Sequence, residues 1–238
     1  MSKLLKSVWI TGASTGIGRA LAKEFAANGE FVIATSRRKE VIENYAKELG
    51  DKSGNILALK LDVTDLKSMK EFYDSVSKEH NISCLINNAG LTSFNEAEKD
   101  SLETIQKIIE TNLLGSIFTM KTVLPEMQKN KSGTIINMLS VVTKKIFTGS
   151  SAYSATKSGL LAYSNSLREE VRQYNIRIIN VIPGATQTPI WPNSTLEKKS
   201  YRMMSPAELA KLIFNLYSVK SNMVAEEIVL RPIQGDLE

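Results

Sequence analysis

The sequence has very few of the residues that crosslink a chain or bind a metal. Among its 238 residues there is one cysteine, Cys84, so an intrachain disulfide is excluded. Cys84 lies in the apolar run ISCLIN, where we expect a small buried thiol. There is one histidine, His80, which we expect at a solvated helix end. Histidine-based zinc sites and Ser-His-Asp catalysis are therefore hard to build from this chain, and we expect no metal.

Long apolar runs and a dense basic stripe are also lacking. No stretch approaches membrane-spanning length. The start, MSKLLKSVWITG, is too short and too soon interrupted for a secretory signal. The net charge of +5 comes from 30 basic and 25 acidic residues spread along the chain, whereas nucleic-acid binding needs clustered basic residues with aromatics. We therefore expect a soluble, cytoplasmic protein that binds neither membranes nor nucleic acid.

Short apolar runs recur along the chain and predict a β-sheet. The hydrophobic content of 42% is enough to build a large core. Near-continuous hydrophobicity in each run is typical of strands that are covered on both faces. The predicted strands are Ser7–Thr11, Phe31–Thr35, Ile56–Leu61, Cys84–Asn87, Thr134–Met138, Arg177–Ile182 and Ala225–Leu230.

Amphipathic helical patterns separate these strands. The first ends at the stop signal Asn28-Gly29, and the others cover about 39–49, 65–79, 101–129, 151–174 and 206–218. Pro125 is expected to bend or end the helix at 101–129. Strand–helix alternation implies parallel strands joined by right-handed crossovers. The predicted fold is a single-domain α/β structure over 1–238, with a Rossmann-type doubly wound parallel sheet of about seven strands and helices on both faces. The long loop at about 184–204 is expected to be functional or mobile.

A glycine-rich turn follows the first predicted strand in VWITGASTGIGRALAKEF. Gly12 allows a backbone conformation barred to other residues, Gly16 lets a phosphate approach the backbone, and Gly18 lets the helix lie close to the sheet. Unpaired N–H groups at the helix start then face an anion, and Ser14 and Thr15 add hydroxyl donors. A merely tight turn is the alternative. The position in the first βα unit favours dinucleotide binding.

Basic residues stand beyond the second strand, where this fold meets the adenosine ribose. An acid there holds the 2′-hydroxyl of NAD, but this chain has Ser36 followed by Arg37 and Arg38. Guanidinium groups form charge-assisted hydrogen bonds with a phosphate, which indicates a preference for NADP(H), mainly through Arg37. The alternative is a pair of solvated charges. Asp62 and Val63, after the third strand, are predicted to face the adenine. The alternative role for Asp62 is to cap the next helix.

Tyr153 and Lys157 share one helix face, because residues four apart on a helix are neighbours. A fixed ammonium beside a tyrosine favours the phenolate, so Tyr153 is a candidate acid/base for a carbonyl or alcohol. Ser140 ends the fifth strand, at the edge where open α/β sheets bind ligands, and can bond the same substrate oxygen. Taken alone, Tyr153 and Lys157 could be a surface pair, and Ser140 could be an ordinary turn residue. The three residues together on one dinucleotide-binding fold are a specific indication of this chemistry.

With these residues, the chain closely resembles the short-chain dehydrogenase/reductase family, of the NADP-preferring type. The resemblance covers essentially the whole length and includes TGASTGIG at 11–18, DV at 62–63, NNAG at 87–90, Asn112 in TNLLG, Ser140, YSATK at 153–157 and PGATQT at 183–188. Family members commonly form dimers or tetramers, so the resemblance implies a homodimer or homotetramer.

The resemblance also assigns roles to individual residues. It implies that Tyr153 is the acid/base, Lys157 its activator, Ser140 the polariser and Asn112 part of a proton relay, the alternative for Asn112 being a buried, locally bonded amide. Trp191, with Ile190, is expected to begin the substrate lid and to contact substrate together with Ser140 and Tyr153. The full set implied to bind NADP(H) is Gly12, Ser14, Thr15, Gly16, Ile17, Gly18, Arg37, Arg38, Asp62, Val63, Asn88, Ala89, Gly90, Tyr153, Lys157, Pro183, Gly184 and Thr188.

The expected function is an NADP(H)-dependent oxidoreductase that acts on a small-molecule carbonyl or alcohol, most simply a carbonyl or 3-oxoacyl reductase. Two rivals stand beside it: an NADP-binding regulator with a vestigial site, and a hydrolase that uses Ser140 and Lys157. Residues 144–147 and the pair Met203 and Met204 are candidates for the substrate pocket. They indicate an apolar substrate, with an acidic group if the two lysines at 144 and 145 face it.

Overall fold

The computed structural model describes residues 4–219 and 222–237, so the two ends of the predicted domain, 1–3 and 238, and the pair 220–221 lie outside it. Within the described residues the strands form one seven-stranded parallel sheet in the order β3-β2-β1-β4-β5-β6-β7. The strands are β1 Leu5–Thr11, β2 Phe31–Ser36, β3 Ile56–Lys60, β4 His80–Asn87, β5 Gly133–Met138, β6 Ile176–Pro183 and β7 Glu227–Leu230. The predicted doubly wound sheet is thus confirmed.

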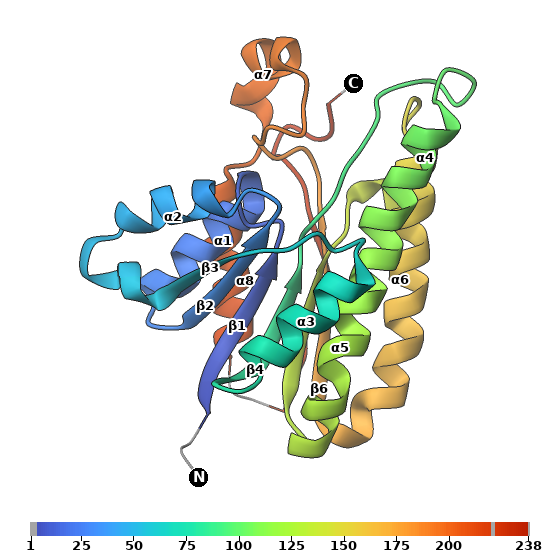
Figure 1. Cartoon of the computed structure of the whole chain (residues 1–238). Helices are drawn as coiled ribbons and strands as arrows, with labels where there is room; N and C mark the ends of the chain where they lie inside the picture. Colours follow the sequence, from blue (N-terminus) through green and yellow to red (C-terminus); the bar gives the residue numbers. More distant parts are fainter. Residues whose placement is uncertain (1–3, 220–221, 238) are drawn as a thin grey trace.

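Helices cover both faces of this sheet (Figure 1). They are α1 Gly16–Ala27, α2 Lys39–Lys47, α3 Leu66–Val76, α4 Leu102–Ile109, α5 Gly115–Asn130, α6 Ser151–Val171, α7 Asn193–Lys199 and α8 Pro206–Ser218. Helices α1, α2 and α8 lie on one side, and α3, α4, α5 and α6 lie on the other. No helix among the described residues has the length and hydrophobicity to cross a bilayer.

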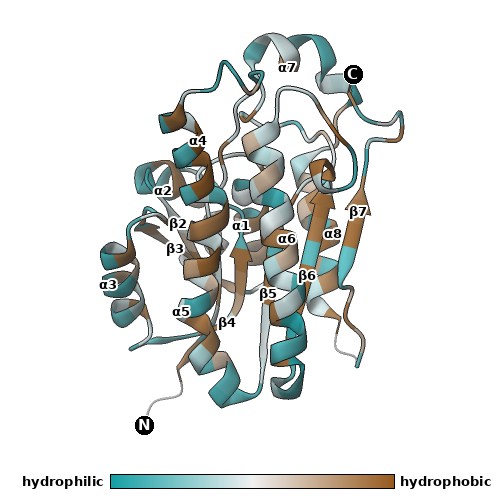
Figure 2. Cartoon of the chain, turned by 90° about the vertical axis from the view of Figure 1, so that its right-hand side faces the viewer, coloured by the Kyte–Doolittle hydropathy of each residue, from teal (hydrophilic) through white to brown (hydrophobic). Residues whose placement is uncertain are grey.

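Strand residues alternate between two hydrophobic cores, because successive side chains point to opposite faces. In β1, Val8 and Ile10 pack in the core that includes Phe25 of α1, and Trp9 packs in the core that includes Met120 of α5. All five side chains are fully buried. Figure 2 shows the same hydrophobic character along much of β6 and β7. Burial on both faces fixes the sheet rigidly, so the carboxyl ends of its strands can hold a site.

The helix predicted over 101–129 has a different form. A π-helical segment, Glu110–Leu114, separates α4 from α5, and the buried Asn112 lies in it. Pro125 does not end this helix, because α5 continues through it to Asn130. Buried Val123 and Met127 hold the helix against the core on either side of the proline.

The expectation for His80 is also wrong. It is buried and begins β4, which starts four residues earlier than predicted and pairs His80 with Leu5. Its Nδ1 lies 2.9 Å from the Ser7 hydroxyl, and its ring stacks on Phe31 with 4.9 Å between centroids. The lone histidine therefore has a structural role in the sheet. Cys84 is buried as expected, and burial raises the pKa of its thiol.

Candidate active site

A cavity of about 880 Å³ opens at the carboxyl ends of the strands. It brings together nearly every residue predicted for the site: Gly12, Ser14, Thr15, Gly16, Ile17, Arg37, Arg38, Asp62, Val63, Asn88, Ala89, Gly90, Ser140, Tyr153, Lys157, Pro183, Gly184, Thr188 and Trp191 all line it. Gly18 and Asn112 do not line the cavity but contact residues that do. Among the described residues, no group of three or more His, Cys, Asp or Glu side chains is placed to hold a metal ion.

The glycine turn between β1 and α1 forms one end of the cavity. Gly12 and Gly16 have φ values of +64° and +57°, a region that disfavours side chains. Gly18 has an ordinary backbone, but a Cβ there would lie 2.4 Å from the Gly12 carbonyl oxygen and from the Asn88 side-chain nitrogen. Thr15, the N-cap of α1, makes no side-chain capping bond. The turn therefore presents the backbone at the start of α1 to the cavity, as an anion site requires.

The NNAG segment after β4 is tied to the same turn. The side-chain nitrogen of Asn88 donates to the carbonyl oxygens of Thr11 and Gly12, at 3.1 Å each. The Thr11 hydroxyl accepts from the backbone N–H groups of Asn88 and Ala89. These bonds link the two strand ends, so this wall of the cavity is held in one position.

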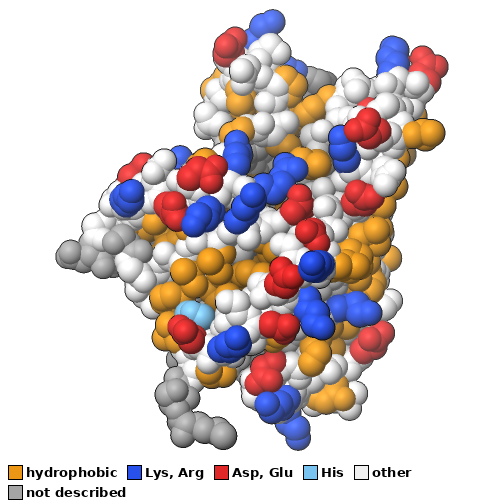
Figure 3. Space-filling view, in the orientation of Figure 1, with side chains coloured by type: hydrophobic (Ala, Val, Ile, Leu, Met, Phe, Trp, Pro, Cys, Tyr) orange, Lys and Arg blue, Asp and Glu red, His pale blue; other side chains and the backbone are white. Residues whose placement is uncertain are grey.

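Arg37 and Arg38 lie where the second strand ends, as predicted. Both are exposed and line the cavity, and Figure 3 shows Lys and Arg side chains gathered on the surface between α2 and α7. The Arg38 guanidinium donates to the Ser14 hydroxyl at 3.3 Å, which places it beside the glycine turn. Its backbone N–H donates to the Ser36 hydroxyl at 3.0 Å. A serine in the place of an acid thus orders the turn that carries two cations.

Asp62 follows β3 and faces the cavity. Its Oδ1 accepts from the backbone N–H and the hydroxyl of Thr64, at 3.0 and 2.8 Å. The capping alternative for Asp62 is wrong, because Asp65 caps α3 by accepting from Lys67 and Ser68. Asp62 is therefore fixed in a turn with its carboxylate at the nucleotide end of the cavity.

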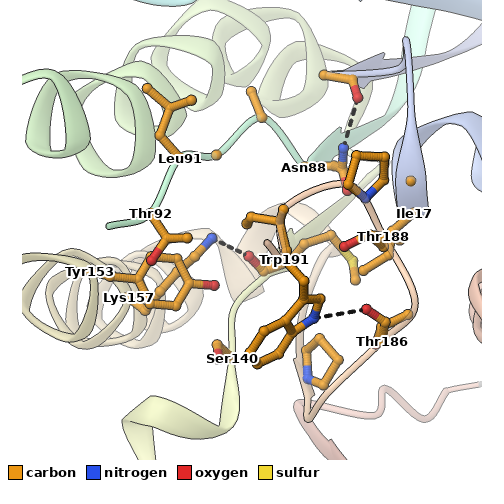
Figure 4. A pocket seen from close by; sticks show the side chains of 18 of the residues that line it. Ile17, Asn88, Leu91, Thr92, Ser140, Tyr153, Lys157, Thr186, Thr188 and Trp191 are labelled. Atoms are coloured by element: carbon orange, nitrogen blue, oxygen red, sulfur yellow. Dashed lines mark hydrogen bonds between the residues drawn. The ribbon is translucent and has the colours of Figure 1, made fainter. Parts of the chain in front are cut away.

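Tyr153, Lys157 and Ser140 meet in the middle of the cavity (Figure 4). The Lys157 Nζ donates to the Met138 carbonyl oxygen at 2.7 Å and lies 5.6 Å from the centroid of the Tyr153 ring. Burial raises the pKa of Tyr153 to about 12, opposed by a hydrogen bond with Ser140. Burial lowers the pKa of Lys157 to about 8. The predicted lowering of the Tyr153 pKa by Lys157 is thus wrong for the protein alone, because desolvation of the phenol dominates and the ammonium bonds a backbone carbonyl.

Asn112 is buried and locally bonded, as its alternative expects, and the relay stays a prediction. Its Oδ1 accepts from the Leu91 N–H at 2.7 Å, and its Nδ2 donates to the Leu91 carbonyl at 2.8 Å and to the Thr156 hydroxyl at 3.2 Å. Leu91 lines the cavity, and Thr156 donates to the Tyr153 carbonyl at 2.7 Å. Asn112 therefore positions the loop after β4 against the helix that carries Tyr153.

The two ends of the segment 184–204 lie side by side. Thr186 and Met204 form a β-bridge, and the Met204 N–H donates to the Ala185 carbonyl at 2.9 Å. The α7 helix projects beyond these ends (Figure 1). Trp191 donates to the Thr186 carbonyl at 3.1 Å and stacks on Phe94, with 5.2 Å between ring centroids. The predicted lid thus contains a helix and contacts the loop after β4.

Phe94 and Asp236 are among the lining residues that the sequence analysis did not predict. Phe94 lies in a loop and Asp236 near the end of the chain, so no local spacing indicates their position. Phe147 lines the cavity, as proposed for residues 144–147, whereas the other three do not. Lys144 pairs with Glu227 at 2.8 Å, Lys145 pairs with Asp236 at 3.6 Å, and Ile146 is 93% exposed. Met203 and Met204 are also absent from the lining.

Comparison with known proteins bears on this geometry. The family model for short chain dehydrogenases matches residues 6–199. The sepiapterin reductase of Chlorobaculum tepidum is 31% identical over 237 residues, which cover 96% of this chain and 97% of that protein. The NADP-dependent 3-hydroxy acid dehydrogenase of Schizosaccharomyces pombe is 34% identical, with 95% and 92% covered. The structure of an alcohol dehydrogenase from Thermococcus sibiricus, complexed with 5-hydroxy-NADP, has a TM-score of 0.88 at 27% identity and covers 99% of this chain and 100% of its own.

Proposed function

Because this chain belongs to the short-chain dehydrogenase family, we propose that it is an NADP(H)-dependent oxidoreductase that interconverts a carbonyl compound and an alcohol. One observation carries the proposal: a single cavity joins the glycine turn and two arginines to Ser140, Tyr153 and the buried Lys157. Two similar proteins named above, a dehydrogenase and an alcohol dehydrogenase, are described with NADP or its derivative.

The lining of the cavity fits a dinucleotide. Positive φ values at Gly12 and Gly16 expose the backbone at the start of α1, where the pyrophosphate of NADP(H) would lie. Arg37 and Arg38 would hold the 2′-phosphate, and Asp62 would accept from the adenine amino group. When bound, NADPH supplies the hydride that reduces the carbonyl carbon.

Tyr153, Ser140 and Lys157 supply and stabilise the proton transfer to the carbonyl oxygen. Tyr153, with its pKa raised to about 12 by burial, holds its proton at neutral pH and can donate it to a carbonyl oxygen. Ser140 bonds the same oxygen and so polarises the carbonyl. Lys157, held on the Met138 carbonyl, places its ammonium behind Tyr153 and stabilises the phenolate once the proton has left. A protonated tyrosine is the form that carbonyl reduction requires.

Residues outside the lining support this step. Asn112 positions Leu91 and the Tyr153 helix. Its part in a proton relay from Lys157 stays a prediction. The segment 184–204 acts as a lid, with Trp191 covering the substrate, over a single catalytic domain. A carbonyl or 3-oxoacyl reductase is consistent with the names of the two relatives, a sepiapterin reductase and a 3-hydroxy acid dehydrogenase.

The test is NADPH oxidation with a panel of carbonyl compounds by wild type and by Tyr153→Phe. The variant should bind NADPH normally and lose roughly a hundredfold or more in turnover, as removal of a general acid does. Tyr163→Phe is the matched control, because Tyr163 lies on the same helix and does not line the cavity. Near-normal turnover in a folded Tyr153→Phe would refute the assignment. Cofactor binding without turnover of any carbonyl would favour the regulator with a vestigial site.

A further inference from the structure

The C-terminal segment places a carboxylate in the candidate active site, and we propose that this group, Asp236, selects the substrate. On this proposal Asp236 binds an N–H donor, such as an amidine, amide or amino group, on the part of the substrate remote from its carbonyl. The inference deepens the proposed function and rests on it, because it assumes that the cavity takes a carbonyl compound.

The backbone after β7 turns the chain back on itself. Leu230 ends β7, and its carbonyl accepts from the Gly184 N–H at 2.7 Å. The Gly235 N–H donates to the Pro232 carbonyl at 2.8 Å, and Gly235 has a φ of +83°. This turn needs the freedom of glycine, and the residue after it is Asp236. The fold therefore returns the chain to the cavity, where Asp236 and Leu237 contribute to the lining.

The two carboxylate oxygens of Asp236 have different surroundings. Oδ2 lies 3.0 Å from the Arg231 guanidinium and 3.6 Å from the Lys145 ammonium. The side chain is only 5% exposed, and its buried Oδ1 has no hydrogen-bond donor among the described residues. Buried carboxylate oxygens are normally hydrogen-bonded, because leaving one unpaired forfeits the hydration that it had in water. A donor on a ligand would satisfy Oδ1.

Charge in the lining argues against an acidic group at this end of the substrate. The cations nearest to Asp236 are already paired, since both Lys145 and Arg231 bind its Oδ2, and Lys144 binds Glu227. Among the described lining residues, the remaining cations are Arg37 and Arg38 at the nucleotide end and Lys157 beside Tyr153. A substrate carboxylate at Oδ1 would therefore lie against a carboxylate oxygen, because both cations contact the other oxygen, Oδ2.

Aromatic residues contribute apolar surface to the cavity that Asp236 also lines. Phe147 contributes to the wall, and Trp191 stacks on Phe94. Flat, apolar walls with a single acidic acceptor suit a planar body that carries N–H groups, because the walls bury its faces and the acceptor fixes its orientation. The structure thus favours nitrogen-bearing carbonyl compounds over 3-oxo acids.

Four ketones of similar size form the probe set: 4-acetylbenzamidine, 4-acetylbenzamide, 4-acetylbenzoate and 4-methylacetophenone. Their dissociation constants are measured by calorimetry on the full chain saturated with NADP⁺, which cannot reduce them. Wild type should bind the amidine about 10- to 100-fold more tightly than the methyl ketone, the range expected for a hydrogen bond to a charged group. The carboxylate should bind most weakly of the four.

The variants Asp236→Leu and Asp236→Asn test the group itself. Asp236→Leu should abolish the preference for the amidine and the amide, and Asp236→Asn should reduce it and improve binding of the carboxylate. Glu227→Gln is the matched control, because it breaks the Lys144 ion pair outside the lining and should leave the four affinities unchanged. Weak or equal binding of all four ketones by wild type, or an unchanged preference in Asp236→Leu, would overturn the inference.

Failure of the proposed function has a separate signature. If the protein does not bind NADP⁺, or if none of the carbonyl compounds in the panel supports NADPH oxidation, the proposed oxidoreductase function is contradicted. Turnover that is abolished by Tyr153→Phe but shows no dependence on Asp236 contradicts only the substrate inference.

Discussion

The ammonium of Lys157 is hydrogen-bonded to the Met138 carbonyl oxygen at the end of β5, 2.7 Å away. It does not bond the phenol of Tyr153, although the two side chains share a helix face and Nζ lies 5.6 Å from the ring centroid. The strand end therefore holds the lysine in place. The tyrosine hydroxyl is left to Ser140, whose hydrogen bond opposes the effect of burial on its pKa.

The burial of Lys157 makes the stability of the fold depend on pH. The folded protein releases the lysine proton near pH 8, whereas the unfolded chain keeps it up to the usual pKa of 10.5. Between these values the unfolded state binds more protons, so the free energy of unfolding rises with pH. Between pH 7 and 9.5, we expect wild type to gain about 2 kcal/mol relative to Lys157→Met.

Urea unfolding of both proteins at pH 7 and 9.5 measures this difference. The upper limit stays below the range in which Tyr153, whose pKa is raised to about 12, begins to oppose the gain. If the free energies of unfolding of wild type and Lys157→Met differ by the same amount at both pH values, burial does not lower the pKa of Lys157.

Local patterns account for the parts of the site that the sequence predicted. Glycines at 12 and 16 indicate a special backbone within one turn, and both have positive φ. Tyr153 and Lys157 stand one helical turn apart, so their shared face follows from helix geometry alone. Ser140 follows from the rule that strand carboxyl ends form the ligand crevice. These features need no knowledge of tertiary contacts.

Contacts between distant segments account for what the sequence did not reveal. Asn87, Asn137 and Asn180 stand at matching positions of β4, β5 and β6 and form a buried row, with hydrogen bonds of 3.0 and 3.2 Å between neighbours. Their alignment depends on strand register, which spacing along the chain does not specify. The same holds for His80 against Ser7 and for Asp236 against Lys145, pairs that only the folded chain brings together.

Arg37 and Arg38 are predicted to set the preference for NADPH over NADH. Each contributes a cation to the lining, and loss of a charge-assisted hydrogen bond to phosphate should raise the KM for NADPH about 10- to 100-fold. We expect Arg37→Ala to have the larger effect, because Arg38 already donates to Ser14. The KM for NADH should stay unchanged in both variants.

Steady-state kinetics with the two cofactors test this preference. Lys39→Ala is a suitable control, because Lys39 is also an exposed cation at this turn but pairs with Glu43 outside the lining. A ratio of the two KM values that is the same in Arg37→Ala, Arg38→Ala and wild type would mean that neither arginine contacts the phosphate.

Gly18 is predicted to tolerate no side chain. A Cβ there would lie 2.4 Å from the Gly12 carbonyl oxygen, which is far inside van der Waals contact and involves backbone that cannot simply rotate away. Gly18→Ala should destabilise the fold by about 1–3 kcal/mol and weaken NADPH binding by displacing the turn. Gly54→Ala, at a glycine with open space around it, should change neither property. Equal melting temperatures for the two variants would contradict the close packing.

Asn112 is predicted to act mainly through the position of Leu91. Asn112→Ala removes both hydrogen bonds to the Leu91 backbone and leaves an N–H and a carbonyl unpaired, which should lower the free energy of unfolding by about 2–4 kcal/mol. Asn112→Asp keeps an acceptor for the N–H but loses the donor, so it should be intermediate. Thr156→Val removes the third contact of Asn112, at 3.2 Å, together with the Thr156 bond to the Tyr153 carbonyl, and should cost about 1–2 kcal/mol.

The stability order separates this positioning role from a role confined to proton supply. A relay residue alone would lower kcat in Asn112→Ala while leaving urea unfolding and the dissociation constant for NADPH as in wild type. Displacement of Leu91, which lines the cavity, should instead change all three together. Unfolding curves, calorimetric NADPH binding and kcat measured on the same three variants therefore decide whether the π-helical segment around Asn112 shapes the cavity or only conducts protons through it.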